Sequence, residues 1–212
     1  MAPHHQALRA ERIPTVNLTS VAVTLIAGYL LGSISFAHLL ARNDAEVEHL
    51  HQHGAGASSV FWIHGPRSAL LVVAGDFGKG VAAGLLAQWL FGPGAIFVAG
   101  TAAVIGHNWP IFYRFKGGRG VLTGAGVLLA LMPFALGLGL IVAIVTFALS
   151  RNTLVSSMAL FSGALAAAWG FGSNKDVLVY AISLPAAVAI YTLLARRHVP
   201  HSERWHSTTL RP

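Results

Sequence analysis

The 212-residue chain has no cysteine, and only 10% of its residues carry a charge. Without cysteine it can form neither disulfide bonds nor thiolate sites, although this absence does not identify a compartment. Acidic residues are the scarcer charged type, with seven against fourteen lysines and arginines. Hydrophobic types make up 55% of the chain and the mean hydropathy is +0.65. The composition is that of an integral membrane protein rather than of a soluble domain.

Long apolar runs predict an all-α fold, a polytopic bundle of about seven transmembrane helices that forms a single membrane domain over residues 1–212. A polar arm at 1–15 precedes the first run, which lacks a small-residue cleavage site and is expected to be a retained span. Most runs reach the ~20 residues needed to cross about 30 Å of hydrocarbon. The runs that meet at Met132 and Pro133 are an exception, because the first is short and the pair could form a broken helix or a hairpin that does not cross. The expected spans are 16–40, 67–91, 94–113, 121–131, 133–149, 153–171 and 177–195.

Lysines and arginines are spread unevenly over the two predicted sides of the membrane. With the N-terminus outside, ten lie on the cytoplasmic side, three lie outside and Lys79 lies within a span. The positive-inside rule therefore predicts an N-out/C-in topology, with cytoplasmic loops at 42–66 and 114–120 and a cytoplasmic tail at 197–212. The formal charge of +7 largely reflects this asymmetry. The chain lacks the basic and aromatic platform of single-strand binders, so we expect contact with membrane lipid and an acidic ligand, and not with nucleic acid.

The end of the 114–120 loop has a composition that a lipid-facing span does not require. Gly117 and Gly118 lie between Lys116 and Arg119, directly before the next apolar run. Paired glycines let the backbone approach a ligand closely, and the following helix offers free N–H groups and the positive end of its dipole. This arrangement predicts a binding site for an anion, most plausibly a phosphate, at the membrane surface.

Two further pairs of polar residues lie within or at the end of apolar runs. Asp76 and Lys79 are three residues apart on one helix face, so they are expected to form a buried structural ion pair beside the site. His107 and Asn108 end the third span, where the imidazole could be a hydrogen-bonded core group, a general base or a donor that orients a ligand. Residues 116–120 are called the anion loop below. The proximity of His107 and Asn108 to this loop in sequence favours a role in the site.

Three sequence blocks carry a resemblance to a known family: GYLLGSISFAHLLAR at 28–42, GPRSALLVVAGDFGKG at 65–80, and IGHNWPIFYRFKGGRGVLTGAGVLLAL at 105–131. In order and spacing they resemble the bacterial acyl-phosphate:glycerol-3-phosphate acyltransferases known as PlsY. The resemblance implies a multi-pass enzyme of the bacterial cytoplasmic (inner) membrane, with its active site at the cytoplasmic face. It would transfer a fatty acyl group from acyl phosphate to glycerol 3-phosphate, giving lysophosphatidic acid for phospholipid synthesis, without a cofactor, a metal or an acyl-enzyme.

The same resemblance implies roles for individual residues. The catalytic set would be Ser33, His107, Asn108 and His198. The substrate- and phosphate-binding set would be Arg42, Lys116, Gly117, Gly118, Arg119, Ser156 and Ser157, with Arg119 in a position that is usually lysine. Simpler explanations exist for several of these, since small residues pack helices together and basic residues near helix ends contact headgroups or cap the helix.

The chain departs from the family in two motifs. Where the family carries GSGNxGATN, this chain has HQHGAGASS at 51–59, and the usual RHREN becomes RHVPH at 197–201. Half of the expected phosphate loop is therefore absent. We expect an acyltransferase that is impaired or redirected to another acceptor; the alternative is a catalytically silent homologue that serves as a structural subunit of a larger membrane protein complex.

Histidines concentrate in the altered loop. The sequence raises the possibility of a metal site formed by His49, His51, His53 and His64 with nearby Glu46 or Glu48. The spacing is not the compact one typical of zinc and the loop has no cysteine, so we expect no metal and instead a solvated, pH-sensitive loop.

Overall fold

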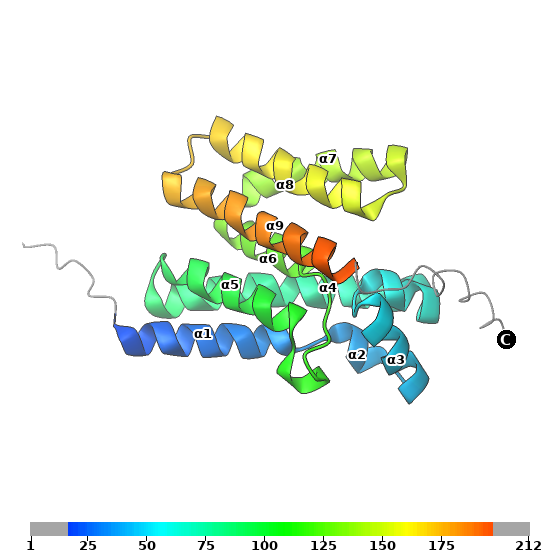
Figure 1. Ribbon diagram of the computed structural model, residues 1–212. Helices are drawn as coiled ribbons and strands as arrows, with labels where there is room; N and C mark the ends of the chain where they lie inside the picture. Colours follow the sequence, from blue (N-terminus) through cyan, green and yellow to red (C-terminus); the bar gives the residue numbers. More distant parts are fainter. Residues whose placement is uncertain (1–16, 197–212) are drawn as a thin grey trace, which may run out of the picture.

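A computed structural model describes residues 17–196, which fold into a bundle of α-helices with a single short 3-10 turn (Figure 1). Turns alternate between the two ends of the bundle. Figure 1 shows the α4–α5 and α8–α9 turns at one end, and α3 with the α7–α8 turn at the other. The elements are α1 (Leu18–Ser33), α2 (Phe36–Leu40), α3 (Asp44–His53), α4 (Ala57–Phe91), α5 (Ala95–Asn108), η1 (Ile111–Tyr113), α6 (Val121–Leu131), α7 (Pro133–Ser150), α8 (Thr153–Gly170) and α9 (Lys175–Arg196).

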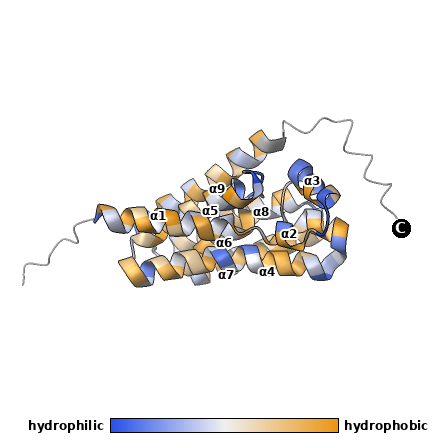
Figure 2. Ribbon diagram, turned by 90° about the horizontal axis from the view of Figure 1, so that it is seen from below, coloured by the Kyte–Doolittle hydropathy of each residue, from blue (hydrophilic) through white to orange (hydrophobic). Residues whose placement is uncertain are grey.

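The predicted all-α membrane fold is confirmed. Six stretches of the described chain are long and apolar enough to cross a membrane, with α1 and α2 counted together as Leu18–Leu40. The seventh apolar helix, α6, has 11 residues and spans only about 16 Å at 1.5 Å per residue. The uncertain pair at residues 121–149 is thus a short helix followed by a full-length one. Figure 2 shows hydrophobic residues along the long helices and hydrophilic ones gathered on α3.

Glycines bring the backbones of α4 and α6 into direct contact. A methyl group on Gly80 would overlap the carbonyl oxygen of Thr123, and a methyl group on Gly126 would overlap that of Phe77. The contact is therefore reciprocal, with one glycine from each helix. Lipid supplies little hydrophobic driving force between helices, so close packing over small residues is a main source of their association. This packing fixes α6, which carries the anion loop at its start, against the long helix α4.

The first predicted span is interrupted. We predicted one helix over 16–40, but α1 ends at Ser33 and Ile34 has an extended backbone with φ −68° and ψ 111°. The Ser35 side chain caps α2 by accepting a bond of 3.5 Å from the backbone N–H of His38. Hydropathy alone could not reveal this break, because the stretch Leu18–Leu40 still reaches a mean hydropathy of 1.8 over an 18-residue window.

The 42–66 segment, which we predicted as a loop, is mostly helical. Asn43 caps α3 by accepting a 2.9 Å hydrogen bond from the N–H of Glu46, and the Glu46 carboxylate accepts one of 2.7 Å from the N–H of Arg42. An Asn-x-x-Glu pattern of this kind is a start signal for a helix. Helix α4 then begins at Ala57. It kinks at Gly65, which has a φ of 77° and directly precedes Pro66. On which side of the membrane this segment lies stays a prediction.

Candidate active site

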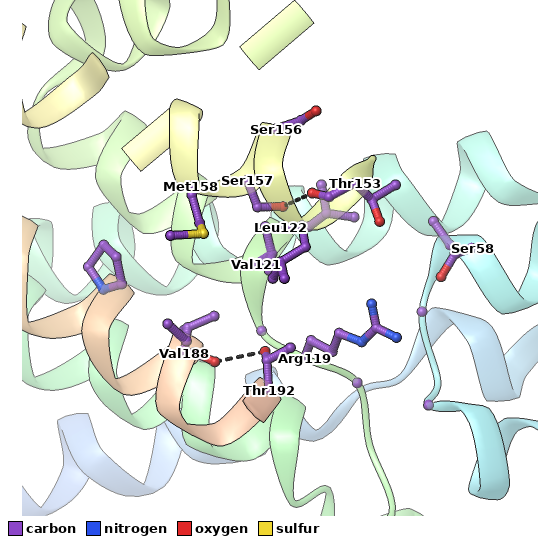
Figure 3. Close-up of a pocket in the computed structure, with 18 of the residues that line it drawn as sticks. Ser58, Arg119, Val121, Leu122, Thr153, Ser156, Ser157, Met158, Val188 and Thr192 are labelled. Carbon is purple, nitrogen blue, oxygen red and sulfur yellow. Dashed lines mark hydrogen bonds between the residues drawn. The ribbon is translucent and has the colours of Figure 1, made fainter. Parts of the chain in front are cut away.

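A cavity of about 500 Å³ opens between α4, α6, α8 and α9, at the end of the bundle where α3 lies. Its two ends differ in chemistry. Ser58 and Arg119 line the polar end (Figure 3), whereas the remainder is mainly apolar and includes Phe147, Met158, Phe161 and Val188. Figure 3 shows Arg119 and Ser58 on one side of the cavity and Met158 and Val188 on the other. The cavity can therefore hold an amphiphile with an anionic head.

Two helices begin at the polar end. Gly56 precedes α4 and Gly120 precedes α6, and neither start has a side-chain cap. The first N–H groups of a helix have no partner within the helix, and the dipole makes this end positive. In Figure 3 the Arg119 side chain reaches towards Ser58 in the first turn of α4. A guanidinium and uncapped helix starts on one cavity suit a phosphate group.

The glycines of the anion loop allow it to cross the rest of the site at close range. The N–H of Gly118 donates a 3.1 Å hydrogen bond to the carbonyl oxygen of His107, and the carbonyl of Gly117 accepts one of 3.1 Å from Ala55. A methyl group on Gly118 would overlap the His107 imidazole, and one on Gly117 would overlap the His107 carbonyl oxygen. The loop therefore needs glycine at both positions for packing, whatever it binds.

A buried charge cluster lies beneath the loop. Lys79 Nζ lies 2.9 Å from Asp76 Oδ1, as expected for the predicted ion pair, and His107 Nδ1 lies 3.5 Å from the same oxygen. All three side chains are at least 95% buried. Lys79 also donates a 2.7 Å hydrogen bond to the carbonyl of Ile34 at the α1–α2 break. The cluster connects α1, α4 and α5 at the wall of the cavity.

Of the residues predicted from the sequence, the cavity brings together Asp76, His107, Gly118, Arg119, Ser156 and Ser157. Both serine hydroxyls donate to carbonyls of their own helix turn, at 2.8 Å and 2.7 Å. Their positions on the wall, rather than any bond they make to another helix, mark them as candidate ligand contacts.

The other predicted residues that lie within the described part of the chain do not line this cavity. Ser33 is completely buried and donates to the carbonyl of Tyr29 at 2.8 Å, which is the packing role that the sequence left open. Arg42 and Lys116 are exposed. Asn108 is buried next to Gly120, and its backbone carbonyl accepts a 3.3 Å hydrogen bond from Tyr191. Gly117 packs closely against His107, and Lys79 forms an ion pair with Asp76, but neither lines the cavity. His198 lies outside the described residues.

Five polar residues on the wall were not predicted as site residues: His53, Ser58, Thr153, Ser162 and Thr192. Thr192 lies deep in an apolar helix and its hydroxyl donates to the Val188 carbonyl at 2.8 Å, so no sequence signal distinguishes it. Ser58 belongs to the HQHGAGASS segment that departs from the family motif, but its place in the first turn of a helix became clear only from the structure, in which α4 begins at Ala57. His53 was considered only as a metal ligand.

The histidines of the altered loop do not converge. His49 and His53 stack with ring centroids 4.2 Å apart, whereas His64 bonds Glu46 at 3.0 Å and His51 lies 3.8 Å from Glu48. Within residues 17–196, no group of three or more His, Cys, Asp or Glu side chains has an arrangement that could hold a metal ion. These histidines therefore act in pairs with separate partners.

Comparisons with known proteins agree with this geometry. A family model described as glycerol-3-phosphate acyltransferase matches residues 22–207. A glycerol-3-phosphate acyltransferase from Halalkalibacterium halodurans is 43% identical over 117 residues, which cover 52% of this chain and 56% of that protein. One from Pseudomonas aeruginosa is 42% identical over 137 residues, covering 63% of this chain and 72% of that protein. The aligned stretch thus spans little more than half of the first relative's length.

The fold is also similar to that of solved structures. Crystal structures of PlsY (YgiH), an integral membrane glycerol 3-phosphate acyltransferase, were determined in a glycerol 3-phosphate form and a lysophosphatidic acid form. Each matches with a TM-score of 0.73 and 29% sequence identity, covering 84% of this chain and 90% of the other. The similarity therefore extends over most of the chain.

Proposed function

The chain belongs to the glycerol-3-phosphate acyltransferase family, and we propose that it transfers a fatty acyl group from acyl phosphate to glycerol 3-phosphate in this cavity. The observation that carries the proposal is the division of the cavity into a polar end, with Arg119 and the start of α4, and an apolar remainder. Acyl phosphate has the same division between its phosphate and its chain. Relatives named glycerol-3-phosphate acyltransferase support glycerol 3-phosphate as the acceptor.

The residues suggest how the chain would carry out the reaction. The acceptor hydroxyl attacks the acyl carbon directly, and the bond from that carbon to the phosphate oxygen breaks. Arg119 and the first N–H groups of α4 hold the phosphate and stabilise its charge as it leaves. The apolar wall around Phe147, Met158 and Phe161 orients the chain, which fixes the carbonyl relative to the attacking hydroxyl.

The helix that replaces the family's glycine-rich segment would weaken this site. Residues 51–53 are the last turn of α3, and the N–H of Gly54 donates to the Leu50 carbonyl at 2.8 Å. Amide groups used within a helix are not available for a phosphate. We therefore propose that the enzyme turns over slowly or prefers a different acceptor, since a misplacement of about 1 Å can reduce a rate by roughly 100-fold.

The direct test is an assay of detergent-purified protein with acyl phosphate and glycerol 3-phosphate. We expect inorganic phosphate and lysophosphatidic acid to form in equal amounts, and Arg119→Gln to lower the rate. Replacing residues 51–54 with Gly-Ser-Gly-Asn, together with Ser59→Asn, should raise the rate if α3 limits phosphate binding. No activity in either protein, with stable co-purification of a partner complex, would favour the structural-subunit alternative.

A further inference from the structure

A turn rich in aromatic residues joins α5 to the anion loop. It comprises residues 109–115, which read WPIFYRF and contain η1, and we call it the aromatic turn. Figure 1 shows the connection between α5 and α6 leaving the end of α5 across the direction in which the long helices run. Because the long helices cross the membrane, a segment that projects sideways at their end lies along the membrane surface. The aromatic turn is therefore placed at the level of lipid headgroups.

The outer side of the aromatic turn is apolar and exposed. Ile111 is 48% exposed, Phe112 is 60% exposed and Phe115 is 56% exposed. These residues follow the end of α5 at Asn108, so they do not belong to a helix face that crosses the hydrocarbon. A group of exposed apolar side chains outside the spans marks a surface that binds lipid or protein.

Three helices hold the aromatic turn in place. The Tyr29 hydroxyl of α1 donates a 2.9 Å hydrogen bond to the carbonyl of Trp109, whose ring packs edge-on against Tyr191 of α9 with centroids 4.7 Å apart. The ring of Tyr113 stacks on His38 of α2 with centroids 4.3 Å apart. The turn is therefore ordered before it meets any partner, so binding costs little conformational entropy.

The backbone of the turn places cations beside the apolar group. Arg114 and Phe115 have left-handed backbones with φ of 52° and 59°, which is uncommon for side chains of this size. The N–H of Phe115 donates a 3.0 Å hydrogen bond to the Pro110 carbonyl, which closes the turn. Arg114 and Lys116 are both exposed, and none of the ion pairs within residues 17–196 includes either of them. No acidic residue occurs in the sequence from 77 to 175, so the surface is positive as well as apolar.

We propose that the aromatic turn is an interfacial anchor that binds anionic lipid headgroups. Ile111, Phe112 and Phe115 insert at the boundary between headgroups and acyl chains, and Arg114 attracts the negative headgroups beside them. Apolar side chains alone would suit neutral lipid or a protein partner equally well, whereas the adjacent cations favour an anionic surface. Anionic lipid then gathers at the connection between α5 and α6, whether or not the protein transfers acyl groups.

The chain has no cysteine, so single-cysteine variants of the full-length protein can be labelled at one position. The proteins are reconstituted in vesicles of phosphatidylcholine and phosphatidylglycerol. A nitroxide on Phe112→Cys should collide more often with oxygen than with a water-soluble nickel chelate. Ile141→Cys is the lipid control, because Ile141 is 59% exposed in the middle of α7, and it should give the same order. Ala45→Cys, at an exposed position of the polar helix α3, is the water control and should give the reverse order.

The choice of lipid is measured with a fluorophore on the Phe112→Cys protein. Nitroxide-labelled phosphatidylglycerol should quench the fluorophore more strongly than nitroxide-labelled phosphatidylcholine at the same mole fraction. Arg114→Gln should reduce this preference by up to about fivefold, the effect of one cation near an anionic surface, and added salt should weaken it as well. Arg151→Gln is the matched control, because Arg151 is exposed with the same φ of 52° but lies in the α7–α8 turn, and it should leave the preference unchanged.

Other outcomes overturn the proposal. More frequent collisions with the nickel chelate than with oxygen at residue 112 would place the aromatic turn in water. Low access to both reagents would mean that a second copy of the chain covers it. Equal quenching by the two lipids, or a preference that Arg114→Gln leaves intact, would exclude recognition of anionic headgroups by the turn. Because none of these measurements depends on acyl transfer, their failure leaves the proposed function untouched.

Discussion

Lys79 donates a 2.7 Å hydrogen bond to the backbone carbonyl of Ile34, so a cation from the middle of α4 stabilises the break between α1 and α2. The same ammonium group lies 2.9 Å from Asp76, whose other neighbour is His107 at the cavity wall. A backbone carbonyl freed by a helix break in a membrane needs a partner, and Lys79 provides it. The ion pair therefore connects the shape of the first span to the site.

This connection predicts strongly coupled effects on stability. Lys79→Met leaves Asp76 uncompensated, and Asp76→Asn leaves Lys79 uncompensated, so each should lower the free energy of unfolding by about 3 to 5 kcal/mol. The double variant should lose clearly less than the sum, because it leaves no unpaired charge. Equilibrium unfolding in detergent measures all three values. Additive losses would show that the two groups contribute independently.

The backbone contact between α4 and α6 predicts opposite results for two nearby glycines. Gly80→Ala should destabilise the protein by roughly 1 to 3 kcal/mol or more, because the new methyl group overlaps the Thr123 carbonyl. Gly78→Ala should be neutral or slightly stabilising, because nothing lies within 4 Å of the added carbon and alanine favours a helix. Thermal unfolding of both variants in the same detergent tests the difference. Equal effects would contradict the close approach.

The cavity distinguishes Arg119 from Lys116, which the sequence treated alike. Arg119→Gln should lower kcat/KM for acyl phosphate by roughly 10- to 100-fold, the loss expected for a hydrogen bond to a charged group. Lys116→Gln should have a smaller effect that shrinks with added salt, because Lys116 is exposed and acts only through its long-range field. Steady-state kinetics at two ionic strengths separates them. A larger loss of kcat/KM in Lys116→Gln than in Arg119→Gln would show that the phosphate of the acyl donor binds nearer to Lys116.

The lowered pKa of His51 predicts that α3 becomes less stable in acid. Burial, then the Lys116 charge and, less strongly, Arg114 lower the pKa of His51 from 6.5, against the opposing effect of Glu48. The unfolded segment therefore binds a proton more readily than the folded one, so α3 loses stability as the pH falls below about 6.5. The ring of His38 lies beside it, with centroids 5.3 Å apart, and adds no compensating negative charge.

Hydrogen exchange over residues 44–53 between pH 7.5 and 5 measures this effect. Exchange in the wild type should accelerate towards pH 5 relative to its intrinsic rate. His51→Gln should reduce that acceleration, because the variant has no proton to gain. Protection that is independent of pH in the wild type would contradict the prediction.

The sequence by itself determined the kind of fold and predicted several residues of the candidate site. Scarce charge and long apolar runs leave a membrane helix bundle as the stable arrangement, since backbone groups in lipid must be bonded within each segment. The spacing of Asp76 and Lys79 placed them on one helix face, and the paired glycines beside Arg119 indicated a close backbone approach. These features depend on neighbours within a few residues, which a sequence displays directly.

Only the tertiary structure decided which side chains share the cavity. Ser33 and Ser156 look alike in sequence, yet one is enclosed by α5 and the other lies on the cavity wall. The structure likewise makes residues 51–53 the last turn of α3 and places His53 on the cavity wall. Such outcomes depend on how helices distant in sequence pack and where they break, and the uniform hydropathy of membrane helices carries no record of which face meets which partner.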